Sequence, residues 1–136
     1  MPLPAAGYSG TPLPRKLGVK PGHRVLLRSP PRGWTVDGLP EGAKVVRSAA
    51  RADVVVAFFR EAAAVEAGVA PLGDVIRPDG SLWLAWPRRA AGHQSDITDN
   101  LLREIVLPTG MVDVKVAALD HNWSALKFVW RAHMRA

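Results

Sequence analysis

The sequence of 136 residues contains no cysteine, which excludes a disulfide framework, a thiolate zinc site and a cysteine nucleophile. A long hydrophobic run is also missing, because the longest, residues 54–59, is far shorter than the ~20 residues that span a bilayer. The opening Met-Pro-Leu-Pro has neither a basic n-region nor an apolar h-region, so we expect no signal peptide. We therefore expect a cytoplasmic protein with no membrane partner.

Acidic residues are missing from the first 36 positions, although that segment holds six basic ones: Arg15, Lys16, Lys20, Arg24, Arg28 and Arg32. The remaining positions carry 12 basic and 12 acidic side chains, so the whole net charge of +6 lies in the first quarter. A clustered positive field attracts phosphates, nucleic acid or acidic protein surfaces. The alternative is a solvated basic surface that aids solubility.

Patterns typical of nucleic-acid-binding proteins are absent. Only Tyr8 and Trp34 are aromatic in the basic segment, too few for a platform that stacks single-stranded bases. No helix-turn-helix, zinc-finger or RNP-like pattern occurs. Nucleic acid therefore ranks as a partner behind a phosphate- or carboxylate-bearing ligand and an acidic protein surface.

Hydrophobic residues make up 48% of the chain and charged residues 22%, values typical of globular proteins. The chain is shorter than the roughly 150 residues typical of one domain, so we expect a single domain over residues 11–136. We expect residues 1–10 to form a flexible segment. The pattern predicts strands at 24–28, 44–47, 53–59, 81–86, 111–119 and 125–131. It predicts a helix at 12–17 that is capped by Thr11, and a second helix at 60–76 that is broken near 68–71. A third predicted helix is capped by Ser95 or Asp96 and ends at about residue 107.

Alternating strands and helices favour a mainly parallel α/β sheet. The last two predicted strands are joined by too short a loop for a parallel crossover, so we expect them to pair antiparallel. Only residues 48–52 separate the second and third strands, although a parallel crossover normally needs about ten or more. Either the second strand is a marginal edge element, or the chain crosses beneath the sheet fully extended.

Residues 53–136 resemble the C-terminal half of Rossmann-like methyltransferases: DVVVAFF their fourth strand, IRPDGSLWLAWP their fifth, and LPTGMVDVKVAAL with ALKFVWRA their terminal hairpin. Over about residues 8–132 the chain more closely resembles the small bacterial proteins of the domain of unknown function 3052 family. The matching stretches are YSGTPLPRKLGVKPG, GSLWLAWPRRAAGHQSDIT and LPTGMVDVKVAALDHNWSALKFV. The resemblance implies a small, truncated Rossmann-like, methyltransferase-like fold and supplies no catalytic residue.

The chain departs from these methyltransferases where a cofactor would bind. They place a carboxylate and a glycine-rich turn after the first strand, whereas here LRSPPRGW offers one glycine, no acid and two prolines without N–H donors. Arg47 stands where an acid would hold ribose hydroxyls. We therefore expect no cofactor. A minimal S-adenosylmethionine-dependent enzyme remains the alternative.

Motifs that carry other chemistry are also missing. No nucleophile elbow, Walker loop or His-Glu-x-x-His motif occurs. The histidines, at positions 23, 93, 121 and 133, lack metal-ligand spacing, so we expect surface histidines and no metal site.

Two segments follow predicted strands at the edge where α/β sheets bind their ligands. They supply the candidate ligand-binding residues Arg28, Arg32, Gly33 and Trp34, then Arg88, Arg89 and Ser95. If the strands at 24–28 and 81–86 are neighbours, four arginines and a helix start converge on one crevice that would suit a phosphate or carboxylate. Alternatively, the arginines pair with Asp37, Asp96 and Asp99, or face water.

Tryptophan is unusually frequent, with five residues. Trp83, Trp86 and Trp130 lie in predicted strands and should pack in the core. Trp34 and Trp123 lie in predicted loops, where an indole is either a lid on the core or a binding surface. The first hypothesis for function is a non-catalytic binding or interaction module with an anion-preferring crevice.

Overall fold

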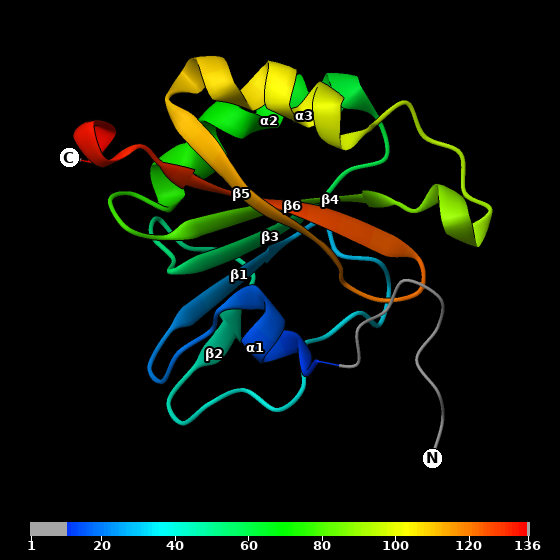
Figure 1. Cartoon of the computed structure of the whole chain (residues 1–136). Coiled ribbons are helices and arrows are strands. Elements are labelled where there is room, and N and C mark those ends of the chain that lie inside the picture. The colour runs from blue at the N-terminus through cyan, green and yellow to red at the C-terminus, as the bar shows by residue number, and fades with distance from the viewer. Residues whose placement is uncertain (1–10, 136) are drawn as a thin grey trace.

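Six strands form one sheet in the order β2-β1-β3-β4-β6-β5 (Figure 1). The computed structural model describes residues 11–135. The strands are β1 (Arg24–Arg28), β2 (Lys44–Val46), β3 (Val54–Phe58), β4 (Ser81–Pro87), β5 (Met111–Ala118) and β6 (Trp123–Trp130). The helices are α1 (Leu13–Leu17), α2 (Ala62–Val75) and α3 (Asp99–Val106), with short 3-10 turns at Arg89–Ala91, Leu107–Thr109 and Ala132–Met134.

Strands β2, β1, β3 and β4 pair in parallel, and β6 then pairs antiparallel with both β4 and β5. This α/β architecture, a mainly parallel sheet with an antiparallel end, is consistent with a small Rossmann-like domain and confirms the expected fold class. The expected flexibility of residues 1–10 concerns positions outside the described part of the chain. No helix within residues 11–135 has the length and apolar character needed to cross a membrane.

The sheet is covered on both faces, so β3 and β4 are buried along their whole length. Helices α2 and α3 lie on one face, while α1 and the connection after β1 lie on the other (Figure 1). Trp83, Trp86 and Trp130 are buried, as expected from their strand positions. The sheet therefore separates two hydrophobic cores, one on each face, and its central strands have no side that faces solvent.

The connection between β2 and β3 covers residues 47–53, longer than predicted, because β2 ends after three residues at the sheet edge. Val45 and Val54 both lie opposite Val25, so the chain moves laterally by two strand spacings, about 10 Å. Eight residues can extend to about 26 Å, which is ample for this crossing. The N–H of Ala52 donates to the carbonyl of Val75 at 3.1 Å, which anchors the end of the connection on the α2 side.

Helix α2 continues through Pro71, so the predicted break near 68–71 is wrong. Val65, Val69 and Leu72 are buried along one side of the helix, and their packing on the sheet outweighs the lost backbone bond at an exposed proline. Gly73 has a separate role: an added Cβ there would lie 3.0 Å from Met111, and its carbonyl accepts from the Trp130 indole at 2.9 Å.

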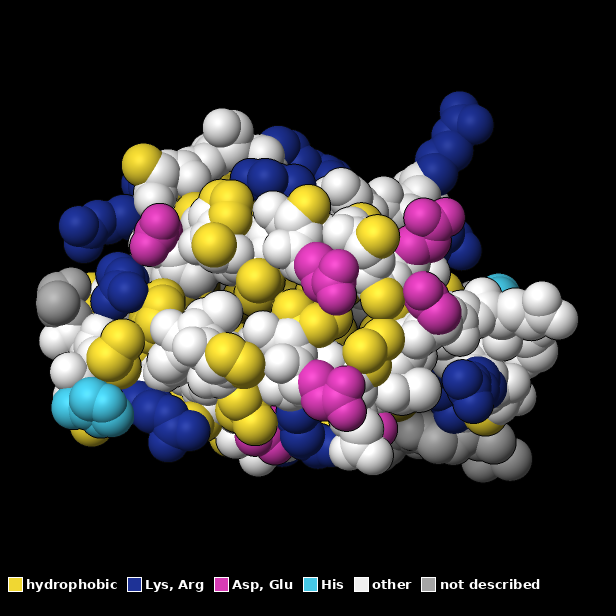
Figure 2. Space-filling model, turned by 90° about the horizontal axis from the view of Figure 1, so that it is seen from above, with side chains coloured by type: hydrophobic (Ala, Val, Ile, Leu, Met, Phe, Trp, Pro, Cys, Tyr) yellow, Lys and Arg dark blue, Asp and Glu magenta, His cyan; other side chains and the backbone are white. Residues whose placement is uncertain are grey.

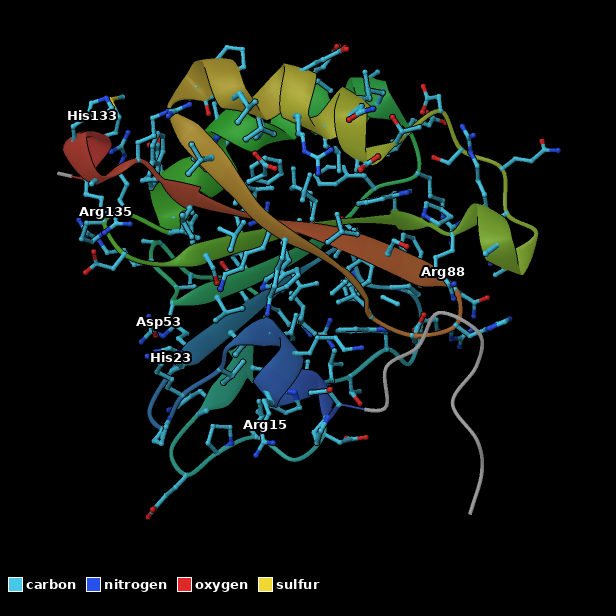
Figure 3. The ribbon with its side chains drawn as sticks, in the orientation of Figure 1. Arg15, His23, Asp53, Arg88, His133 and Arg135 are labelled. Atoms are coloured by element: carbon cyan, nitrogen blue, oxygen red, sulfur yellow. The ribbon has the colours of Figure 1, made fainter. Side chains whose placement is uncertain are left out.

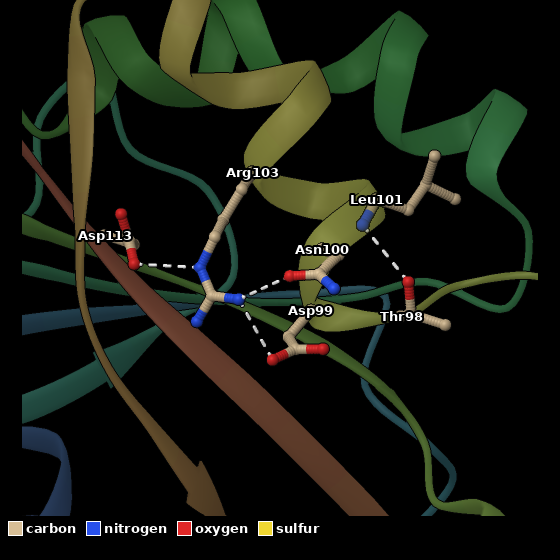
Figure 4. Close-up of polar contacts among 6 residues, drawn as sticks. All are labelled: Thr98, Asp99, Asn100, Leu101, Arg103 and Asp113. Carbon is tan, nitrogen blue, oxygen red and sulfur yellow. Dashed lines mark hydrogen bonds and ion pairs between the residues drawn. The ribbon is translucent and has the colours of Figure 1, made fainter.

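The predicted helix caps are also wrong in position. Helix α1 has Pro12 at its N-cap and no side-chain cap bond, so Thr11 does not cap it, although Gly18 ends it in the left-handed conformation as expected. Helix α3 begins at Asp99 with Thr98 as its cap, and Thr98 Oγ1 accepts from the N–H of Leu101 (Figure 4). Ser95 and Asp96 instead bond to the segment that precedes α2 and to its first turn.

Arg103 connects α3 to the edge strand β5. Its guanidinium donates to Asp113 at 2.9 Å and to Asp99 and Asn100 at 3.0 Å each (Figure 4). The bond from Arg103 holds the pKa of Asp113 below its ordinary value of 3.8, and the paired carboxylates raise the pKa of Arg103. The contact therefore contributes stability while Asp113 is ionised.

We expect Asp113→Asn to lower the free energy of unfolding at neutral pH and to have a smaller effect at an acidic pH below 3.8. The pKa of Asp113 is lowered on folding, so its contribution is present above the unfolded value of 3.8 and is lost as pH falls through the folded value. Urea unfolding at the two pH values measures the difference. Asp79→Asn, at an exposed carboxylate, is the control, and an equal loss in both variants would contradict the prediction.

Candidate functional site

The segment that follows β1 turns sharply at Ser29, whose φ of 56° is the only positive φ of a non-glycine residue in the described chain. A left-handed serine is strained, and such strain concentrates at functional sites. Pro30 and Pro31 follow, and the N–H of Trp34 donates to the Pro31 carbonyl at 3.0 Å. The sequence thus forms a stiff turn that offers few backbone N–H donors.

This turn borders a hollow between the carboxyl ends of β1 and β3. The hollow has a volume of about 250 Å³ and is lined by Ser29, Pro30, Pro31, Phe58, Arg60 and Trp123. Chain order along the sheet reverses at this point, because β1 connects outward to β2 and β3 connects the other way to β4. Open α/β sheets bind their ligands at such a reversal. We call this place the carboxyl-edge hollow.

Aromatic rings form one wall of the carboxyl-edge hollow. Phe58 makes edge contacts with Trp34 and Trp123, with ring centroids 4.8 and 5.0 Å apart. The guanidinium of Arg60 lies 5.1 Å from the centroid of the Trp123 ring. Trp123 is only 6% exposed, so it packs as a lid on the core and also lines the hollow. Trp123 therefore combines the two predicted alternatives, a lid on the core and a binding surface.

Asp120 joins the β1 turn to the β5–β6 hairpin. Its Oδ2 accepts from the Trp34 indole at 3.0 Å, and its Oδ1 accepts from the N–H groups of Asn122 and Trp123. One carboxylate thus holds both tryptophans that flank Phe58. Its lone pairs are committed to the loop, so the neighbouring His121 gains no acid partner from these bonds.

The expected crevice between the strands at 24–28 and 81–86 does not form as predicted, because β3 lies between β1 and β4. Arg88 is buried at the end of β4, and its Nη1 donates to the His121 carbonyl at 2.9 Å. Figure 3 shows Arg88 beside the β5–β6 hairpin. Arg89 is exposed and lines a different hollow, with Trp86 and Asp99. Neither arginine lines the carboxyl-edge hollow.

The other predicted residues lie at or near the hollow. Arg28 directly precedes Ser29, while Arg32 and Gly33 follow Pro31, and all three are exposed. Ser95 Oγ donates to the carbonyl of Arg60 at 3.0 Å, so this predicted residue positions the segment that bears Arg60. Sequence analysis missed Arg60, because its position depends on contacts with Ser95 and Trp123, which are distant in the chain.

The predicted carboxylate partners of the arginines have other contacts within residues 11–135. Asp37 accepts from the Thr35 hydroxyl, and Asp99 pairs with Arg103. Asp96 Oδ1 accepts from the N–H of Ala62 at 2.9 Å and so caps α2 from the loop before α3. No ion pair of the described residues involves Arg28, Arg32 or Arg60. Asp96 also occupies the start of α2, so that helix end does not serve as an anion site.

A larger groove, about 670 Å³, lies at the opposite edge, among the amino ends of the strands. Its basic residues include Lys20, Arg24 and Arg51. Its Asp53 accepts from the N–H of Arg24 at 2.8 Å, and Figure 3 places Asp53 beside His23. Arg77, also in this groove, stacks on Trp130 at 3.8 Å and donates to the Met134 carbonyl at 2.7 Å. This groove therefore contains both acidic and basic side chains, and Asp53 and Arg77 already bind other groups of the protein.

The charged groups are unevenly distributed over the surface. Seen toward α2 and α3, the molecule presents acidic side chains among apolar ones, with basic side chains mostly toward the rim (Figure 2). Among residues 11–135 no three His, Cys, Asp or Glu side chains gather as a metal site would require. His93, for example, contacts Asn122 at 2.9 Å.

Comparisons with known proteins found no matching family model, no matching curated protein and no matching solved structure. The resemblance to the domain of unknown function 3052 family therefore stays a prediction from the residues alone.

We expect Asp120→Ala to lower the free energy of unfolding by about 1–3 kcal/mol, because it leaves an indole and two N–H groups without their acceptor. Loss of near-ultraviolet circular dichroism would report the loosened Trp34 and Trp123. His121→Ala is the matched control, since His121 contributes its backbone carbonyl to Arg88 and its side chain is exposed. Equal stability of the two variants would show that Asp120 does not hold the hollow together.

Proposed function

We propose that this protein is a non-catalytic binding module whose carboxyl-edge hollow takes a small ligand bearing a phosphate or carboxylate group. One observation carries the proposal. At the reversal of strand order, Arg60 lines a hollow flanked in the chain by Arg28 and Arg32, and none of the three has an ion-pair partner among residues 11–135. Guanidinium groups bind carboxylate and phosphate through paired hydrogen bonds.

The dimensions of the hollow support a small ligand. About 250 Å³ is below the usual range of roughly 300–1,000 Å³ for pockets that enclose a cofactor or a drug-sized molecule. The wall formed by Phe58 and Trp123 offers a ligand apolar surface beside the exposed side chain of Arg60. Ser29 adds a hydroxyl at the rim. These features favour a compact anion with some apolar surface.

The alternative, a minimal S-adenosylmethionine-dependent methyltransferase, has less support from the same residues. A nucleoside cofactor needs backbone donors and an acceptor for its ribose. Pro30 and Pro31 line the hollow without N–H groups, and its charged side chain is Arg60 rather than a carboxylate. Arg47 is exposed directly after β2, where an acid would be needed.

We expect Arg60→Ala to weaken binding of inorganic phosphate or citrate at least about tenfold, because a charge-assisted bond contributes roughly 1.5–3 kcal/mol. Arg32→Ala should weaken binding as well. Calorimetry gives the affinities, and the shift of the melting temperature with ligand concentration gives an independent measure. Arg131→Ala, at an exposed arginine outside the hollow, is the matched control.

Unchanged affinity in Arg60→Ala and Arg32→Ala would overturn the proposed site. Absence of any shift with phosphate, citrate and other small anions would overturn the proposed ligand class. A melting-temperature rise with S-adenosylmethionine that Arg60→Ala abolishes would instead support the methyltransferase alternative.

A further inference from the structure

Two lysines face each other across the terminal hairpin. Lys115 of β5 lies opposite Lys127 of β6, and the ammonium groups lie 5.9 and 5.8 Å from the centroid of the Trp83 ring. Like charges in directly opposed strand positions destabilise a sheet. This cross-strand pair on the α1 face therefore concentrates two positive charges over a buried tryptophan, whose ring face offsets only part of their repulsion.

A third lysine adds to the same field. Lys20 follows α1, and a Cβ added at Gly18, which ends this helix, would lie 3.7 Å from the Lys127 ammonium. Burial lowers the pKa of Lys127, and the charges of Lys115 and Lys20 lower it further. Among residues 11–135, Lys115 and Lys20 are the charged groups that shift it. We call Lys20, Lys115 and Lys127 the lysine cluster.

The lysine cluster has no acidic partner in the part of the chain that the structure describes. The ion pairs there all belong to Arg77 or Arg103. Asp113, two residues before Lys115, is held by Arg103 of α3. The positive charge of the cluster is therefore uncompensated by the described residues.

Packing over Trp83 accounts for the hydrocarbon stems, and the ring face attracts both ammonium groups, which lie near the roughly 6 Å limit of such contacts. Lysine stems often cover apolar surface while their ammonium groups reach solvent. A single stem with a neutral or acidic neighbour would cover the ring equally well, without repulsion. A multivalent anion would neutralise the positive charge of Lys20, Lys115 and Lys127 that the ring leaves uncompensated.

A groove extends between α1 and β5 from Lys115, the member of the lysine cluster that lines it. It has a volume of about 450 Å³ and is lined by Thr11, Arg15, Lys16, Lys115, Val116, Ala117 and Ala118. The Lys16 ammonium donates to the Ala118 carbonyl at 2.7 Å and so fixes α1 against the strand. Arg15 is exposed and adds a further cation along the groove. The basic surface is therefore elongated.

We propose that the lysine cluster and this groove bind a ligand with two or more linked phosphate groups, at a site independent of the carboxyl-edge hollow. Lysine binds phosphate as a point charge with three rotatable N–H donors, so several lysines can adapt to a chain of linked phosphate groups. An elongated row of cations matches a chain of charges better than a single anion. Tripolyphosphate, diphosphate and inorganic phosphate are the probes.

We expect affinity to rise from phosphate to diphosphate to tripolyphosphate, and to fall about tenfold or more for tripolyphosphate in Lys127→Met and in Lys115→Met. Methionine keeps an apolar chain over Trp83 and removes the repulsion, so both variants should melt no lower than the parent protein without ligand. Lys44→Met is the matched control, because Lys44 is an exposed strand lysine that also faces a cation, Arg24, outside the groove. It should bind as the parent protein does.

The pKa of Lys127 provides a readout that a purely structural lysine would not change. Saturating tripolyphosphate should raise this pKa, followed by NMR of the lysine Cε groups, because the bound anion stabilises the ammonium form. Binding should correspondingly weaken as pH rises through the lowered pKa of Lys127. An unchanged pKa, or parental affinity in Lys127→Met, would overturn the proposal.

Two further arms separate the possible outcomes. Arg60→Ala should keep its tripolyphosphate affinity, and Lys127→Met should keep its citrate affinity at the carboxyl-edge hollow, so either site can fail alone. If only long nucleic acids bind, with a steep salt dependence and no response to tripolyphosphate, the surface is a nucleic-acid interface and the oligophosphate proposal is wrong.

Discussion

The pairing of β6 with β4 positions every surface to which we assign a role. Six residue pairs, from Leu82 with Phe128 to Pro87 with Trp123, fix its register. The same register puts Trp123 against Phe58 at the carboxyl edge and Lys127 opposite Trp83 on the α1 face. A slip by one residue would turn both side chains to the other face of the sheet. The antiparallel end of this sheet is therefore as important for binding as the parallel part.

Much of the fold could be predicted because the signals are local. Continuous apolar runs identified β3 and β4, and a loop of hairpin length required β5 and β6 to run antiparallel. Local signals failed where distant contacts override propensity. Pro71 is tolerated within α2 because Val65, Val69 and Leu72 pack on the sheet, and the short link into β3 is possible because β2 has only three residues. Neither the packing of α2 on the sheet nor the short length of β2 can be inferred from the neighbouring residues in the sequence.

The candidate site was predicted less completely, since its residues come together through strand order. The turn from Arg28 to Trp34 lies at the expected edge, but Arg88 holds the hairpin loop instead of lining the hollow. Arg60 gains its position from the Ser95 hydroxyl, 35 residues further along the chain, and from the Trp123 ring. Such placement follows from β3 lying between β1 and β4, which periodicity and spacing do not specify.

Cationic side chains remain available for ligands because several carboxylates bind backbone N–H groups instead of arginine or lysine side chains. Several carboxylates accept hydrogen bonds from the backbone: Asp53 from Arg24, Asp96 from Ala62, and Asp120 from Asn122 and Trp123. These bonds stabilise turns and a helix start, but they do not neutralise guanidinium or ammonium groups. The first 36 residues carry the whole basic excess and contain no acidic residue. The carboxylates that stabilise the fold therefore leave positive charge unpaired. Anion binding at Arg60 and at Lys127 would use the charge that this arrangement leaves over.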